Sequence, residues 1–77
     1  MRCAVCGDRQ IDMHHIKTRK SGGTDDDWNL LPLCRTHHTE THAIGCVSFI
    51  EKYNLHTTYS NKGWLIVEVF GRKKLMR

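Results

Sequence analysis

Two pairs of potential metal ligands, each with two residues between its members, constrain the fold of this chain more than any other feature. Cys3 and Cys6 form the first pair, and Cys34 and His37 form the second pair, with 27 residues between the two pairs. Zinc prefers thiolate and imidazole ligands, and four protein ligands make a closed structural site. A 77-residue chain needs such support, because so small a core rarely supplies more than about 3–5 kcal/mol. The spacing therefore predicts a structural Zn²⁺ site. Buried thiols beside a surface histidine, or a disulfide, are the alternatives.

Length, charge and cysteine usage exclude several classes of protein. Residues 1–77 allow a single domain and are too few for a catalytic barrel or a doubly wound dinucleotide fold. If the chain starts natively at Met1, no secretory signal is visible, and no apolar run approaches a membrane span. We therefore expect a cytoplasmic protein with no membrane partner, in which cysteine pairs bind metal. Cys46 has no partner at this spacing, which favours a buried thiol on a helix. The formal net charge of +4 favours a polyanionic partner.

The first half of the chain is expected to form two short strands and a helix. Residues 10–16 predict a strand, residues 17–28 a polar loop, and residues 30–33 a second strand that Pro32 confines to a sheet edge. A helix is expected from Thr36, which serves as its N-cap, with Glu40 in its first turn and Gly45 at its end.

The second half is expected to add a helix and a β-hairpin over residues 46–70. Residues 46–53 predict a helix with a buried stripe of Val47, Ile50 and Tyr53, which stops at Asn54. Residues 64–70 are the strongest strand prediction, with residues 55–59 as the expected partner across a turn at residues 60–63. The basic segment 71–77 is expected to be a frayed tail. The large aromatic side chains are expected in the core: Trp28, Phe49, Trp64 and Phe70.

A histidine cluster is the second candidate site. His38 and His42 are four residues apart, so they lie on one face of a helix, where two imidazoles can share a metal ion. His14 and His15 are adjacent on a strand, where a regular pleat directs them to opposite faces. Phosphodiester cleavage needs a cation at the scissile phosphate and a base for the attacking water, and histidines can supply the metal site and the base. Surface or core histidines without a chemical role are the alternative.

The order and spacing of these motifs resemble the HNH nuclease family. The similar segment covers residues 3–42, with His-His-Ile at 14–16, Gly-Gly at 22–23, Asn-Leu-x-x-Leu-Cys at 29–34 and His-x-x-x-His at 38–42. The resemblance implies an α+β domain of the ββα-metal (His-Me finger) type, in which two strands and a helix surround one divalent ion. In this chain the two-knuckle zinc site would staple that domain.

The resemblance also assigns roles to individual residues. His15 matches the family's general base, and Asn29 matches the residue whose amide ties the loop to the strand and holds the base in position. His14, His38 and His42 match ligands of the catalytic ion. Because His14 stands where the family commonly has Asp, the nitrogen-rich set favours Mn²⁺, Ni²⁺, Co²⁺ or Zn²⁺ over Mg²⁺. The adjacency of His37 and His38 leaves open which histidine serves which ion.

Basic residues in two segments are candidates for DNA contacts: Lys17, Arg19 and Lys20 in the loop, and Arg72, Lys73 and Lys74 in the tail. Solvated basic segments are the alternative, and residues 25–27, all Asp, are expected on the far side of the loop. We expect a divalent-metal-dependent DNA endonuclease that nicks with low sequence specificity, alone or recruited by another protein, as a monomer or a dimer. A non-catalytic zinc-knuckle DNA-binding module and a protein–protein adaptor that uses the hairpin edge are the alternative functions.

Overall fold

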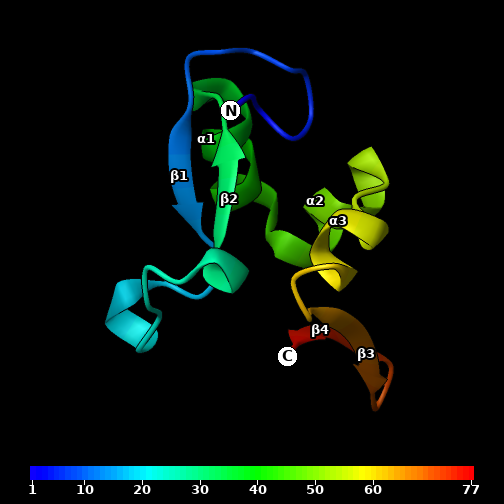
Figure 1. The fold of residues 1–77 in the computed structure, drawn as a ribbon. Coiled ribbons are helices and arrows are strands. Elements are labelled where there is room, and N and C mark those ends of the chain that lie inside the picture. Colours follow the sequence, from blue (N-terminus) through cyan, green and yellow to red (C-terminus); the bar gives the residue numbers. More distant parts are fainter.

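The computed structural model describes residues 1–77 as three helices and two small antiparallel sheets (Figure 1). The strands are β1 (Asp12–His15), β2 (Leu30–Leu33), β3 (Leu65–Val69) and β4 (Arg72–Met76), and the helices are α1 (Arg35–Ile44), α2 (Cys46–Tyr53) and α3 (His56–Ser60). Two short 3₁₀ turns, Arg19–Ser21 and Asp27–Asn29, interrupt the predicted polar loop. No helix is long and apolar enough to cross a bilayer.

The first sheet pairs β1 with β2 in antiparallel register, from Asp12 opposite Leu33 to His15 opposite Leu30. Both predicted strands are confirmed, although β1 is shorter than residues 10–16. Pro32 is tolerated because each strand of a two-stranded sheet is an edge. Its carbonyl accepts a hydrogen bond from the Ala4 N–H at 2.9 Å, which fixes the N-terminal segment against β2. Helix α1 packs against both strands.

Helix α1 has its N-cap two residues earlier than the sequence predicted. Cys34 is its N-cap, so Thr36 lies inside the first turn and its predicted capping role is wrong. Glu40 lies beyond the first turn, where its carboxylate accepts hydrogen bonds from Lys52 and Tyr53 of α2 instead of facing the helix dipole. The predicted end at Gly45 is confirmed, and its φ of 88° separates α1 from α2.

Helix α2 has the predicted bounds and ends at Asn54, whose left-handed φ of 53° suits an asparagine C-cap. The predicted buried stripe is confirmed only at Ile50, which is fully buried together with Phe49. Val47 and Tyr53 are half-buried. The apolar face of α2 is therefore rotated toward Phe49.

The C-terminal hairpin differs from its predicted form. Strand β3 is confirmed, but its partner is β4 in the basic segment, across a two-residue turn at Phe70 and Gly71. The segment predicted to pair with it forms helix α3 instead, and its Tyr59 is buried together with Leu55, the N-cap residue four positions earlier. The predicted frayed tail is also wrong, because Arg72–Met76 is a hydrogen-bonded strand. Helical spacing of two buried residues outweighs the β-branched composition of residues 55–59.

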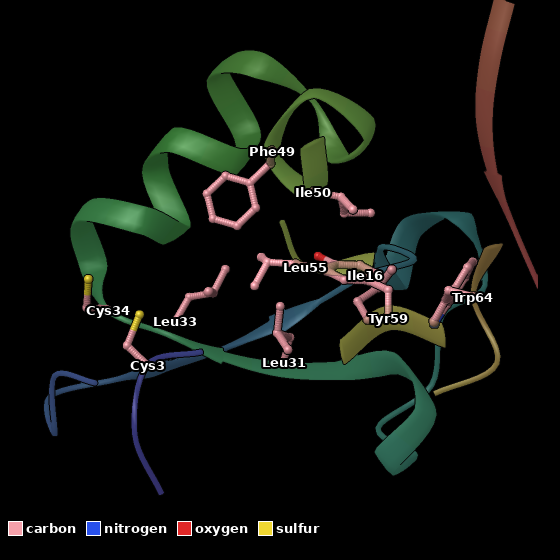
Figure 2. Packing of buried hydrophobic residues seen from close by; sticks show 10 residues of the cluster. All are labelled: Cys3, Ile16, Leu31, Leu33, Cys34, Phe49, Ile50, Leu55, Tyr59 and Trp64. Carbon is pink, nitrogen blue, oxygen red and sulfur yellow. The ribbon is translucent and has the colours of Figure 1, made fainter. Parts of the chain in front are cut away.

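The core is one cluster that runs from the N-terminal cysteines to the hairpin (Figure 2). Cys3 and Cys34 lie side by side at one end, and Trp64 lies at the other end. The Trp64 indole N–H donates to the Trp28 carbonyl at 2.7 Å and so joins the hairpin to the loop before β2. Burial is confirmed for Phe49 and Trp64, and Trp28 packs against the cluster, but Phe70 is fully exposed, so its predicted core position is wrong.

Candidate metal and nuclease site

Four ligand-type side chains meet at the junction of the N-terminal segment and α1. The cluster comprises Cys3, Cys6, Cys34 and His37, whose potential ligand atoms all lie within 4.8 Å of one another. The Cys6 and Cys34 sulfur atoms are 3.8 Å apart, and His37 Nδ1 lies 3.1 Å from the Cys34 Sγ. Backbone hydrogen bonds hold the knuckle closed, since Cys3 N–H donates to the Asp8 carbonyl at 2.8 Å. The two predicted ligand pairs therefore come together in space.

The chemistry of this group fits a bound metal ion. Burial raises the pKa of the Cys3 thiol, but backbone hydrogen bonds from Cys6, Cys34 and Val5 outweigh it and lower the pKa to about 6. A thiolate is the form that binds zinc. Cys46 lies outside the group and is half-buried, not fully buried as the sequence predicted, and burial raises the pKa of its thiol. These four residues could hold a structural metal ion.

Three histidines form a second group. His14 comes from β1, and His38 and His42 come from successive turns of α1, with potential ligand atoms within 4.8 Å of one another. The Nε2 atoms of His38 and His42 are 3.2 Å apart, and the His14 ring lies 5.1 and 5.2 Å from those two rings. The sequence left open which of the adjacent His37 and His38 belongs to which group. In the structure His37 lies with the cysteines and His38 lies with His14.

His14 carries the clearest sign that this group fits a cation. Its side chain is 2% exposed, yet neither ring nitrogen has a hydrogen-bond partner. An unpaired polar group in the interior is unfavourable unless something binds it. Burial, together with the nearby His38 and His42, lowers the pKa of His14 to about 4. At neutral pH the ring is therefore uncharged, with a lone pair available for a metal ion.

Asp12 contacts one of these histidines, a role that the sequence did not predict. Its Oδ2 lies 3.2 Å from His38 Nδ1, so a hydrogen bond from that nitrogen leaves Nε2 directed at the group. Arg35 lies 3.4 Å from the same carboxylate oxygen. Asp12 and His14 are two residues apart on β1 and hence on the same side of the strand, a pattern that was visible in the sequence.

His15, the predicted base, is not part of the histidine group. Its Nε2 lies 2.7 Å from Asp25 Oδ1, and the Arg19 guanidinium contacts the same carboxylate at 3.1 Å. The hydrogen bond with His15 and the charge of Arg19 lower the pKa of Asp25. The prediction that the three aspartates lie on the far side of the loop is thus wrong for Asp25, because it pairs with a loop cation.

Asn29 lies fully buried at the base of the same loop. Its Oδ1 accepts from Lys17 N–H at 2.7 Å, and its Nδ2 donates to the carbonyls of Lys17 and Thr24 at 2.9 and 2.8 Å. Gly23 is required beside it, since a Cβ there would lie 1.8 Å from the Lys17 carbonyl oxygen. The amide therefore ties the segment that follows His15 to the start of β2.

The predicted DNA-contacting residues lie in two separate places. Lys17 and Lys20 are exposed in the loop, where Arg19 is engaged by Asp25. The other three belong to β4, in the hairpin at the lower right of Figure 1: Arg72, Lys73 and Lys74. Lys73 forms an ion pair with Glu51 at 2.7 Å, whereas Arg72 and Lys74 form none. Four of these six cations are therefore free of ion pairs.

Comparisons with known proteins agree with this arrangement. A segment of 54 residues is 43% identical to the "Uncharacterized protein YdfU" of Escherichia coli (strain K12), covering 66% of this chain and 15% of that protein. The chain thus spans less than a sixth of the length of this relative. No solved structure matches this chain. The family described as "Putative HNHc nuclease" matches residues 1–69, which include both ligand groups. The chain belongs to this HNHc nuclease family.

Proposed function

We propose that this chain is a divalent-metal-dependent DNA endonuclease in which β1, β2 and α1 form a ββα-metal unit. The observation that carries the proposal is the buried, unpaired imidazole of His14 beside His38 and His42. In this account these three histidines hold the catalytic ion, and the cysteine group with His37 holds a structural zinc. A bound divalent ion supplies positive charge at the scissile phosphate and at the leaving oxygen.

His15 is the proposed general base. Its Nε2 is engaged by Asp25, so a hydrogen bond there leaves Nδ1 free to accept a proton from the attacking water. His15 directly follows His14 on β1, and its ring is near enough to contribute to the lowered pKa of His14. Asn29 acts on this base indirectly, because two of its three hydrogen bonds fix the backbone at Lys17, two residues beyond His15, and the third holds the Thr24 carbonyl.

Asp12 is proposed to position His38 for the ion. A hydrogen bond from His38 Nδ1 to the carboxylate fixes the ring and makes Nε2 the ligand atom. Arg35 neutralises part of the charge on the same carboxylate. The proposed ligand set is then three imidazole nitrogens, which favours Mn²⁺, Co²⁺, Ni²⁺ or Zn²⁺ over Mg²⁺.

Supercoiled plasmid tests this function directly. The zinc-loaded chain is incubated with plasmid and a series of added divalent ions, and conversion to open circles is followed with time. We expect nicking that requires an added ion and is lost in His15→Ala, with DNA affinity unchanged. A folded His15→Ala variant that nicks at the wild-type rate would contradict the role of the base. DNA binding without cleavage under any ion would favour the non-catalytic zinc-knuckle alternative.

A further inference from the structure

The tip of the β3–β4 hairpin carries an aromatic side chain that the fold does not use. Phe70 is fully exposed, at 101% of its reference area, and has a φ of 51°. Together with Gly71, at 75°, it forms a two-residue turn with both φ angles positive. Such turns favour Asn, Asp or Gly at the first position, because a bulky side chain is strained there. Strained, exposed residues of this kind concentrate at functional surfaces.

The two faces of the hairpin differ in what they contact. On the inner face, Ile66 and Leu75 are cross-strand partners and pack against the core. On the outer face the strand register places three β3 residues opposite three β4 residues: Leu65 opposite Met76, Val67 opposite Lys74, and Val69 opposite Arg72. Leu65, Val69 and Met76 are 60%, 42% and 52% exposed. The outer face is therefore an unpartnered surface with one apolar row and one mainly basic row.

Charge selects the partner of this face. Arg72 and Lys74 form no ion pair, and no carboxylate lies on the outer face, because Glu68 is opposite Lys73 on the inner one. A second copy packed face to face across a two-fold axis would bring like charges together, which is unfavourable. A polyanion that also contains stacked flat apolar rings can pair its negative charges with the cations and stack its rings on the exposed aromatic side chain.

We propose that the hairpin is a wedge for duplex DNA, in which Phe70 inserts between neighbouring base pairs while Arg72 and Lys74 bind phosphates. This inference rests on the proposed nuclease function and adds a way to hold and bend the substrate. Apolar wedges of this type partly unstack a base step and kink the duplex. The longest dimension of the chain, 39 Å, covers about 11 base pairs at 3.4 Å per pair, so a duplex of that length matches the whole length of the molecule.

The test is a binding experiment that needs no cleavage. Duplexes of about 20 base pairs, longer than this footprint, carry 2-aminopurine at successive positions, and zinc-loaded chain is added without a second divalent ion. We expect 2-aminopurine fluorescence to rise where the base step opens. Phe70→Asn should abolish the rise and weaken binding about tenfold, as expected for loss of one aromatic–base stack. Because Asn-Gly suits this turn, the variant should melt at or above the wild-type temperature.

Matched variants distinguish insertion of Phe70 from nonspecific electrostatic binding of DNA. Phe70→Trp keeps an aromatic ring and should keep the fluorescence rise. Replacing Arg72 and Lys74 by Gln should reduce the slope of log affinity against log salt by about 1.8. No fluorescence rise with the wild type, or the same rise in Phe70→Asn, would overturn the proposal. So would a Phe70-dependent dimer with unchanged DNA binding. Plasmid nicking by the same preparations shows separately whether the nuclease function holds.

Discussion

Replacing Asn29 by Ala tests how the loop after His15 is fixed. The substitution removes three hydrogen bonds at a fully buried position and leaves the Lys17 N–H and two carbonyls without partners. At about 1 kcal/mol for each bond, the free energy of unfolding should fall by about 3 kcal/mol. For a chain of this size that corresponds to a melting temperature lower by roughly 12–24 °C.

The assay is urea unfolding followed by circular dichroism at a fixed free Zn²⁺ concentration, because bound metal adds to the apparent stability. Gly23→Ala provides a matched perturbation, since its Cβ would enter the same network at the Lys17 carbonyl. We expect the double variant to lose less stability than the sum of the two single variants. A loss below about 1 kcal/mol for Asn29→Ala, or full additivity with Gly23→Ala, would refute the argument that these bonds anchor the loop.

Four further predictions follow from the two ligand groups. Cys34→Ser should lose cooperative thermal unfolding, whereas Cys46→Ser, outside the group, should keep it. If Cys34→Ser unfolds cooperatively at the wild-type temperature, the cysteine group does not hold a structural metal ion. His14→Asp should shift the ion that gives the fastest nicking toward Mg²⁺, and an unchanged ion preference would exclude His14 as a ligand. Asp12→Asn should weaken Mn²⁺ binding, measured by calorimetry, by roughly 10–100-fold through His38, and equal affinity would contradict that role. The pKa of His14 is about 4 in the folded chain and near 6.5 in the unfolded chain. Its contribution to the free energy of unfolding is therefore complete above pH 6.5 and is lost progressively as the pH falls toward 4. His14→Gln should make the free energy of unfolding less dependent on pH in this range, and an equally steep dependence in the variant would contradict the low pKa of His14.

Sequence reasoning worked best where candidate ligands are close along the chain. The Cys3–Cys6 and Cys34–His37 pairs each fit one turn of backbone, and His38 and His42 share a helix face, so local geometry alone fixes them. His14 and Asn29 came from the family motif. The structure places His14 beside the helix histidines and Asn29 at the base of the loop, while their chemical roles stay predictions. Asp12 was missed as a partner of His38 because the contact depends on how α1 packs on β1, across 26 residues.

The hairpin shows why the remainder could not be predicted. Residues 60–63 contain Asn and Gly and resemble a turn, whereas Phe70 is a poor residue for a positive φ, so local preference favoured the wrong partner for β3. Residues 56–60 are rich in β-branched and aromatic side chains, yet burial of Leu55 and Tyr59 on one side makes them helical. In both places tertiary packing outweighs local propensity.

The central claim is that His14, His38 and His42 hold an ion that cleavage requires. The most direct measurement titrates Mn²⁺ into the zinc-loaded chain while ion occupancy, by calorimetry, and plasmid nicking rate are followed on the same samples. We expect one Mn²⁺ per chain beyond the structural zinc, a nicking rate that rises in proportion to that occupancy, and loss of both in a folded His14→Ala variant. Nicking that saturates without a second bound ion, or that persists unchanged in His14→Ala, would contradict the proposed role of these histidines.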